Sequence, residues 1–411
     1  MPHKHAVILL SLIVLGVLGG ALCGWYFGPA MVNIAWLGDL FLNALKMLIV
    51  PLIVAAVVSG VASLGDVRKL GRLGGATVLY FVITTGIAVV IGLLMVNLIQ
   101  PGVGLALNHG EIPEHIRAKA DTGIGDILLT MVSPNLVESA VKMQLLPLIL
   151  FSILLSAALT TLGGKGEHVI AFFDGLNEAL MKVVIWLMYL APVGIFALVA
   201  ARLGKAGGGE AFFAQVSAVG WHVVTVLSGL GLHFIILTAI LMVVARRGLA
   251  FLANMLRALL TAFGTASSSA TLPMTLECLR ENEVDERAIR FVVPLGATVN
   301  MNGTALYEAE AALFIAQAYG IDLSFGQQAI VFVTATLAAI GAAGIPEAGL
   351  VTMVIVLQAV GLPLEGIGLL LAVDWFLDRF RTMINVWGDS VVSTVVHRFL
   401  PDTGKSTHIH T

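Results

Sequence analysis

The sequence predicts an all-α integral membrane protein that crosses the bilayer many times. Of its 411 residues, 58% are apolar, and the 22 Lys and Arg plus 25 Asp and Glu make up only 11%, against about 25% in soluble domains. The mean hydropathy is +0.99, and glycine is frequent at 44 residues, as expected where helices pack closely in lipid. So few charges cannot cover a water-soluble surface, which excludes a soluble enzyme. The net charge of -3 offers no basic surface to nucleic acid.

Six long apolar stretches fill the first half of the chain. A helix that spans a bilayer needs about 20 mostly apolar residues. The first stretch is too long for a secretory signal peptide and is followed by no small-residue cleavage site, so we expect it to remain as a span. The six predicted helices cover residues 6–27, 34–64, 75–100, 126–162, 168–203 and 211–246.

Basic residues lie in alternate connections between these helices. Cytoplasmic loops of membrane proteins carry an excess of Lys and Arg, so we place these connections, and both termini, in the cytoplasm. An Asn-x-Thr acceptor occurs only at Asn302, which falls at membrane depth, and this favours a bacterial-type inner membrane over a glycosylated eukaryotic surface. The basic residues are Lys4, Arg68, Lys69, Arg72, Lys165, Arg246 and Arg247.

The second half has shorter apolar runs that polar clusters interrupt. Segments 251–281 and 324–362 are predicted to be re-entrant hairpins that approach from opposite sides, and each precedes a broken helix, at 287–318 and at 364–396. This order predicts an inverted repeat. Non-helical backbone at membrane depth is tolerated only where it is buried in protein or lines a polar cavity, and paired interrupted segments indicate the binding site of a transporter. The total is eight transmembrane helices, two hairpins and a disordered tail at 401–411.

Five polar residues of the last helix form a single stripe. Asp374, Asp378, Arg381, Asn385 and Asp389 follow at steps of 4, 3, 4 and 4, which places them on one helical face. Ionisable groups inside a span are costly and are functional candidates by default. The alternative is an ion-pair stripe that only holds helices together.

The stripe suits a zwitterion that bears a second carboxylate. The planar fork of Arg381 can bind a carboxylate through two parallel hydrogen bonds, and Asp378 can hold an ammonium group one turn earlier. The second carboxylate would need hydroxyl and backbone N–H donors, which Ser267, Ser268 and Ser269 offer at the turn of the first hairpin. Serine runs also occur as small packing residues, and that alternative stays open.

Four motifs in order carry a family resemblance: TASSSATLP, NMNGTALYEA, GAAGIPEAGLVTM and AVDWFLDRFRTMINVWGD. They resemble the glutamate/aspartate:cation symporters, both the archaeal aspartate transporters and the animal excitatory amino acid transporters. The resemblance implies a homotrimer with an elevator mechanism. It further implies a static scaffold from residues 1–74 and 101–208, and a moving transport domain from residues 75–100 and 209–400.

The resemblance also implies the residues of two kinds of site. In the substrate site, Asp378 would bind the amino group and Arg381 the side-chain carboxylate; the other substrate-binding residues would be Ser267, Ser268, Ser269, Thr304, Gly344, Ile345, Gly349, Thr382 and Asn385. The cation-binding residues would be Gly296, Thr298, Asn300, Asn302, Asn385, Asp389, Thr84 and Thr85. Asp389 and Asn300 are the candidate sodium ligands, since hard cations prefer such oxygens.

Two positions depart from the family pattern. The chain has Asn302 where relatives have Asp, and Phe81 where sodium-coupled members have a second Tyr. A neutral amide offsets a buried cation less well than a carboxylate does, so one sodium site is in doubt although Thr84 and Thr85 remain. Glu308 matches the proton-carrying glutamate of the animal transporters, and burial favours a protonated carboxyl. Its alternative is a permanently neutral acid; for the added Glu310, a structural role is favoured.

The sequence therefore predicts a secondary symporter of acidic amino acids, L-glutamate or L-aspartate, that uses a cation gradient. Protons are favoured over sodium, no cofactor is expected, and H+ and/or Na+ are co-transported. The expected partners are the substrate, the lipid bilayer and two further copies of the chain. The alternatives are a sodium-coupled carrier, a C4-dicarboxylate carrier of the same fold, a channel and an intramembrane hydrolase. The hydrolase is disfavoured because the serines lack a nucleophile elbow and a histidine base.

Overall fold

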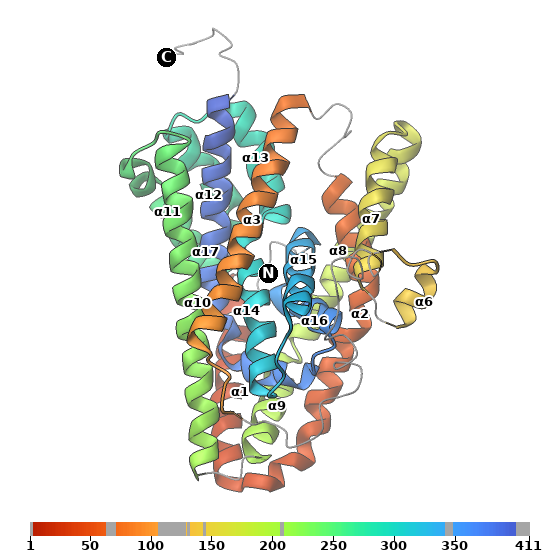
Figure 1. Cartoon of the computed structure of the whole chain (residues 1–411), viewed down its shortest axis with the longest axis vertical. Helices are drawn as coiled ribbons and strands as arrows, with labels where there is room; N and C mark the ends of the chain where they lie inside the picture. Colours follow the sequence, from red (N-terminus) through yellow and green to blue (C-terminus); the bar gives the residue numbers. More distant parts are fainter. Residues whose placement is uncertain are drawn as a thin grey trace.

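The computed structural model consists of helices joined by turns (Figure 1). It describes residues 3–62, 71–105, 129, 132–142, 145–205, 209–341 and 348–399, and no strand occurs among them. The first-half elements are α1 (His3–Phe27), the 3-10 helix η1 (Gly28–Ile34), α2 (Ala35–Ala62), α3 (Gly71–Ile99), α6 (Leu136–Val141), α7 (Leu145–Thr160), α8 (Gly164–Met188), α9 (Ala191–Lys205) and α10 (Gly209–Val243). The second-half elements are α11 (Leu249–Thr265), α12 (Ser268–Glu281), α13 (Glu286–Val299), α14 (Asn302–Ala318), α15 (Phe325–Gly341), α16 (Ala348–Val360), the 3-10 helix η2 (Leu364–Gly366) and α17 (Ile367–Phe399).

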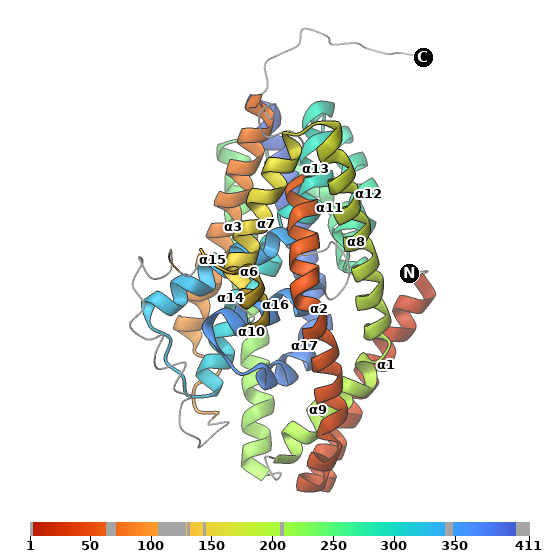
Figure 2. The same cartoon turned by 90° about the vertical axis from the view of Figure 1, so that its right-hand side faces the viewer.

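Glycines at every fourth position bring α1 into close contact with α9. A Cβ atom at Gly16 would lie 2.5 Å from the carbonyl oxygen of Pro192, and one at Gly20 would lie 2.7 Å from that of Phe196. A spacing of four residues places both glycines on one helical face. Small residues of this kind let helix backbones approach each other in a membrane. Helix α9 also contacts α2, so these three helices form one packed group (Figure 2).

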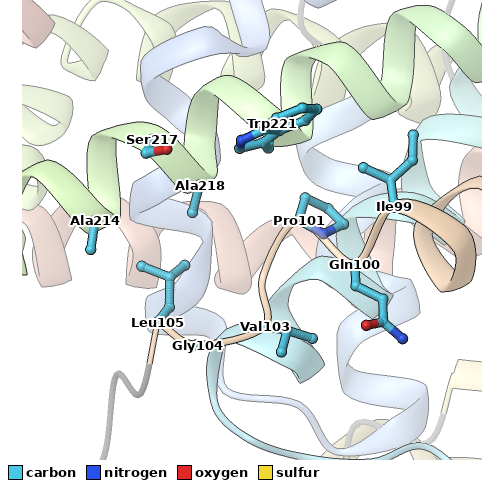
Figure 3. A pocket seen from close by; sticks show the side chains of 10 residues that line it. All are labelled: Ile99, Gln100, Pro101, Val103, Gly104, Leu105, Ala214, Ser217, Ala218 and Trp221. Atoms are coloured by element: carbon cyan, nitrogen blue, oxygen red, sulfur yellow. The ribbon is translucent and has the colours of Figure 1, made fainter.

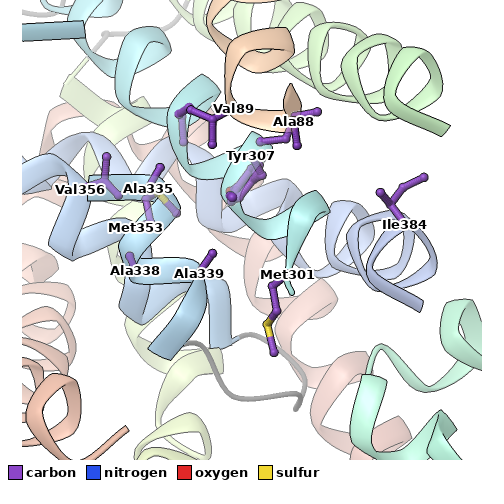
Figure 4. Close-up of a cluster of buried hydrophobic side chains, with 14 of the residues drawn as sticks. Ala88, Val89, Met301, Tyr307, Ala335, Ala338, Ala339, Met353, Val356 and Ile384 are labelled. Carbon is purple, nitrogen blue, oxygen red and sulfur yellow. The ribbon is translucent and has the colours of Figure 1, made fainter. Parts of the chain in front are cut away.

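Helix α14 lies at the centre of a second packed group. All of its residues except Gln317 are buried, and it contacts α3, α10, α15, α16 and α17. Figure 4 shows Tyr307 of α14 among small and branched side chains, including Ala88 and Val89 of α3. Because other helices surround α14, its polar residues are kept away from lipid.

Two pairs of consecutive helices fold back on themselves at the positions predicted for hairpins. Helices α11 and α12 contact each other and are joined only by Ala266 and Ser267. Helices α15 and α16 also contact each other; residues 342–347 between them lie outside the described part of the chain. The predicted break in 287–318 falls at Asn300 and Met301, between α13 and α14.

Two predicted first-half helices are each divided. The prediction of one helix over 126–162 is wrong, because residues 132–135 are non-helical and Asn135 caps the short helix α6: its Oδ1 accepts hydrogen bonds from the backbone N–H groups of Val137 and Glu138 at 3.0 and 3.2 Å. The prediction of one helix over 168–203 is also wrong. Helix α8 ends at Met188 and α9 begins at Ala191, because Pro192 lacks the N–H group that a continuous helix would need.

The prediction of a second broken helix at 364–396 is wrong as well. After the short turn η2, α17 runs without interruption from Ile367 to Phe399. Its polar stripe therefore lies on a continuous helix, and of the two fully described segments that follow the hairpins, 287–318 and 364–396, the first is the one unwound within its length, at Asn300 and Met301.

Three helical stretches among the described residues are long and apolar enough to cross a membrane: Leu15–Phe41, Gly74–Ile99 and Val216–Val243. Their outer faces expose large apolar side chains, for example Leu22 on α1, Leu98 on α3 and Ile235 on α10. Exposed apolar surface on this scale is typical of contact with lipid or another protein.

Candidate functional site

The guanidinium of Arg381 lies at the centre of the polar stripe on α17. Its side chain is fully buried, and it pairs with two carboxylates of the same helix: Nη1 lies 2.9 Å from Oδ1 of Asp374, and Nη2 donates to Oδ1 of Asp378 at 2.8 Å. The guanidinium carbon also lies 4.1 Å from the centroid of the Tyr307 ring, which is a cation–π distance. The positive charge of the arginine is thus paired within α17 in this conformation, while its Nε has no hydrogen-bond partner among the described residues.

The second helix pair approaches this guanidinium through a glycine. A Cβ atom at Gly349, near the start of α16, would lie 3.1 Å from Nη1 of Arg381. Any larger residue would have to displace the arginine or the helix. Gly344 and Ile345, which were predicted to bind substrate through their backbone, lie outside the described residues.

The unwound segment before α14 is attached to α17 by Asn385. The backbone N–H of Gly303 donates to Oδ1 of Asn385 at 2.8 Å, and Nδ2 of Asn385 donates to the hydroxyl of Thr304 at 3.3 Å. A Cβ atom at Gly303 would lie 2.5 Å from the carbonyl oxygen of Arg381. Thr382 is buried beside this contact on α17. The predicted residues of α14 and α17 therefore come together around Arg381.

The three serines of the first hairpin have different surroundings. The hydroxyl of Ser267 accepts a hydrogen bond from the backbone N–H of Ala270 at 3.1 Å and so caps α12, while Ser268 is buried and Ser269 is exposed. Ala266 before them has φ +48°, a left-handed conformation that is costly for a residue with a Cβ atom. Because of this strained turn, no helical turn precedes the first residues of α12, and backbone N–H groups at such a helix start can bind an anion.

Arg379 attaches the first hairpin to α17. Its Nη1 donates to the carbonyl oxygens of Phe263 and Gly264, each at 3.0 Å. These carbonyls belong to the last turn of α11, where a cation is favourable. No role for Arg379 was predicted from the sequence, and its position off the polar stripe was the available signal that it faces another element.

The candidate cation ligands cluster where α3, α13, α14 and α17 meet. Nδ2 of Asn300 donates to Oδ1 of Asp389 at 2.9 Å, and the Thr84 hydroxyl lies 3.4 Å from Oδ1 of Asn300. A Cβ atom at Gly296 would lie 2.2 Å from Oδ1 of Asp389, so only glycine leaves room for this carboxylate. A buried carboxylate next to amide oxygens suits a hard cation. Thr298 uses its hydroxyl locally, donating to the carbonyl oxygen of Leu295 at 3.0 Å.

Asn302 forms the other part of this cluster. The Thr85 hydroxyl donates to Oδ1 of Asn302 at 2.8 Å. Nδ2 of Asn302 has no hydrogen-bond partner among the described residues, and a Cβ atom at Gly388 would lie 2.9 Å from it. The amide therefore presents an N–H donor at a position where a cation would need an oxygen.

Two glutamates of α14 are fully buried in different directions. Glu308 lies near the Thr352 hydroxyl of α16, on the side of the second helix pair. Glu310 lies against α3 and α10, where Cβ atoms at Gly92 and Gly229 would come within 3.2 and 2.6 Å of its side chain. Tyr307, for which no role was predicted from the sequence, lies beneath the guanidinium of Arg381; only its position within the NMNGTALYEA motif pointed to it.

Buried, paired charges inside a bundle of apolar helices are typical of the substrate and ion pathways of membrane proteins, and comparison with known proteins specifies the class and the family. A model of the sodium:dicarboxylate symporter family matches residues 9–399. The chain belongs to this family.

Several curated animal proteins are similar over most of the chain. Excitatory amino acid transporter 3 of Oryctolagus cuniculus is 39% identical, over 96% of this chain and 86% of its own. The human protein of that name is 37% identical over the same shares, and excitatory amino acid transporter 1 of Ambystoma tigrinum is 40% identical over 87% of this chain and 76% of its own. The predicted family, and the prediction of a transporter and not an enzyme, are confirmed.

Proposed function

We propose that this protein is a secondary active symporter whose transport of acidic amino acids, L-glutamate or L-aspartate, is coupled to a cation gradient. The family is named for symport of dicarboxylates with sodium, and the similar animal proteins are named excitatory amino acid transporters. The pairing of Arg381 with Asp378 carries the proposal for this chain. A substrate carboxylate can replace an aspartate on the guanidinium, and the carboxylate thus released can bind the substrate's ammonium group.

The same pairing favours an amino acid over a C4-dicarboxylate. A dicarboxylate has two anionic groups and no ammonium, so it would leave Asp378 as a buried and unpaired carboxylate. Such an uncompensated charge is costly. A neutral amino acid, conversely, has no second carboxylate that could bind the guanidinium of Arg381. We propose that the remaining predicted substrate-binding residues, from Ser267 to Asn385, also contact the substrate in this site.

Protons and sodium are the two candidate coupling ions. Sodium is supported by the family's name and by the cluster of Asp389 with Asn300. Protons are supported by the amide of Asn302, whose N–H group faces the cluster, and by the fully buried Glu308. We propose that Glu308 is protonated when the carrier is loaded, so that no uncompensated anion crosses the membrane with the substrate.

We further propose eight transmembrane helices, two re-entrant hairpins and an elevator mechanism in a homotrimer. The close packing of α1 with α9, and of α2 with α7 and α8, supports a scaffold from residues 1–74 and 101–208. The packing of α3, α10, α14 and α17 supports a transport domain from residues 75–100 and 209–400. The cytoplasmic termini rest on the distribution of basic residues, and the bacterial-type inner membrane rests on the lack of an Asn-x-Ser/Thr acceptor other than Asn302; both remain part of the proposal.

Uptake into proteoliposomes tests the proposal. Labelled L-aspartate is offered under a sodium gradient, under an inward proton gradient, and under neither. We expect uptake with at least one gradient, competition by L-glutamate, and little competition by succinate. Under the proton gradient, Glu308→Gln should retain exchange of internal for external aspartate but lose pH dependence. Uptake that responds steeply to sodium and not at all to protons would assign coupling to the Asp389 cluster and contradict the role of Glu308.

A further inference from the structure

Glu310 is a buried acid for which the proposed transport mechanism has no use. Its side chain lies in a slot between α3 and α10 that exists because both helices have glycine there. A Cβ atom at Gly229 would lie 2.6 Å from its Oε1, and one at Gly92 would lie 3.2 Å from its Cγ. Neither carboxyl oxygen has a hydrogen-bond partner among the described residues. A carboxylate ion without a donor is strongly disfavoured in such surroundings, so the group is protonated in this conformation.

A second unpartnered titratable group, His222 of α10, lies against the same face of α14. Its ring centroid is 4.6 Å from that of Phe314 and 6.0 Å from that of Tyr307. Positions 307, 310 and 314 follow at steps of three and four, so Glu310 lies between these two rings on one helical face. His222 and Gly229 are seven residues apart and also share a face. Both ring nitrogens of His222 lack partners among the described residues.

The charged groups nearby favour transfer of a proton by His222 over its storage. The guanidinium of Arg381 lies over the Tyr307 ring, so a positive charge on His222 would be repelled across that ring. On the packed elements α15 and α16, no described residue is titratable. The other buried titratable groups on α14 and on the helices packed against it are His233 on α10, Tyr307 and Glu308 on α14, and Asp374, Asp378 and Asp389 on α17.

A cavity reaches to within one helical turn of His222. It has a volume of about 370 Å³ and lies between the residues that follow α3 and the first turns of α10 (Figure 3). Gln100 and Ser217 give it polar groups that can hold water. Ala218, in the cavity wall, is four residues before His222 on the same face of α10. Trp221, also in the wall, directly precedes His222.

We propose that Glu310 is a second proton-binding site, which exchanges its proton with water in this cavity by way of His222. The neutral imidazole takes a proton on one ring nitrogen from a hydronium ion, which becomes water, and gives the proton of its other nitrogen to the carboxylate. The Glu310 side chain swings from Gly229 toward the ring for this step. The proposal rests on the proposed function only in that a carrier would move this proton together with its substrate.

Infrared spectroscopy of the reconstituted full-length protein without substrate tests this site. Glu310 is identified by comparing two spectra: its band is the carbonyl band of a protonated carboxylic acid that the wild-type protein shows and Glu310→Gln does not. In wild-type protein we expect this band to shift after transfer to D2O and to disappear at high pH. If Glu310→Gln fails to fold, Glu310→Met supplies the reference, because it has similar length and no acidic proton.

The route is tested by the rate of the same shift. His222→Phe and Ala218→Leu should each slow it at least tenfold, whereas Ala239→Leu, the same change at an exposed position of α10, should leave it unchanged. A Glu310 band that never shifts and never titrates would overturn the proton site. A shift that neither variant slows would overturn the route. Because no substrate is present, failure of acidic amino acid uptake would leave this test intact.

Discussion

Replacing Arg381 by cysteine should convert the preference for acidic amino acids into one for small neutral amino acids. The guanidinium is the only buried cation among the described residues of the polar stripe, and it holds both Asp374 and Asp378 within 3 Å (2.9 and 2.8 Å). Without it, the substrate's second carboxylate would face two carboxylates and no cation. Removal of a buried, hydrogen-bonded charge partner costs about 2–5 kcal/mol. Since each 1.4 kcal/mol is a factor of ten, L-aspartate should bind about 30- to 4,000-fold more weakly.

Calorimetric titration of the purified protein with L-aspartate and with L-serine measures this change. Arg381→Cys with Asp374→Asn is the informative second variant, because it removes one of the two unpaired carboxylates. We expect it to recover folding stability and L-serine binding, but not L-aspartate binding. Arg398→Cys, at an exposed position of the same helix, is the control and should bind L-aspartate as wild type does. Unchanged aspartate affinity in Arg381→Cys would refute the assignment of this arginine to the substrate carboxylate.

Three further changes follow from the structure. Asp378→Asn should nearly abolish L-aspartate binding but weaken succinate less, because only the ammonium needs that anion; equal losses in a competition assay would instead assign Asp378 to helix packing. Gly296→Ala would place a Cβ atom 2.2 Å from Oδ1 of Asp389 in the candidate cation site. The ion dependence of substrate binding should therefore shift, and about 1–3 kcal/mol of stability should be lost. Ion dependence like that of the wild type would exclude this carboxylate as a ligand. Hydrogen bonds from Arg280 and then Arg290 lower the pKa of Glu286 to about 2, so their stabilisation should be present above pH 4.5 and fade as the pH falls toward 2. Since these side chains are largely exposed, Glu286→Gln should cost under about 1 kcal/mol in thermal unfolding at neutral pH, and a cost that persists at pH 2 would contradict this account.

The arrangement of the candidate site residues on α17 could be predicted from the sequence, because helical spacing alone decides which of them share a face. The pairing of Arg381 with Asp378 follows from a step of three residues within one helix. The break at Asn300 was also predictable, because a polar NMNGT cluster at membrane depth conflicts with a continuous lipid-facing helix.

Other features depend on contacts between distant segments, which the periodicity of polar and apolar residues within one segment does not predict. The hydrogen bonds of Arg379 to Phe263 and Gly264 join residues 116 and 115 positions apart. The division of the fifth helix before Pro192 was missed because a proline inside an apolar run is compatible with either a kink or an end. The continuity of α17 was missed for the opposite reason, since charged residues in an apolar run can indicate a break or a buried stripe.

The complete enclosure of α14 has a consequence for how the chain is made. During synthesis a segment that carries Asn302, Glu308 and Glu310 partitions poorly from the translocon into lipid, because acidic residues at the centre of a span oppose insertion. The helix that shields its polar face, α17, is completed only 81 residues after Ala318. At about 5–20 residues per second, α14 waits about 4–16 s for this neighbour. We therefore expect the nascent chain to hold α14 at the translocon, beside the earlier helices α3 and α10, until synthesis of α17 releases them together.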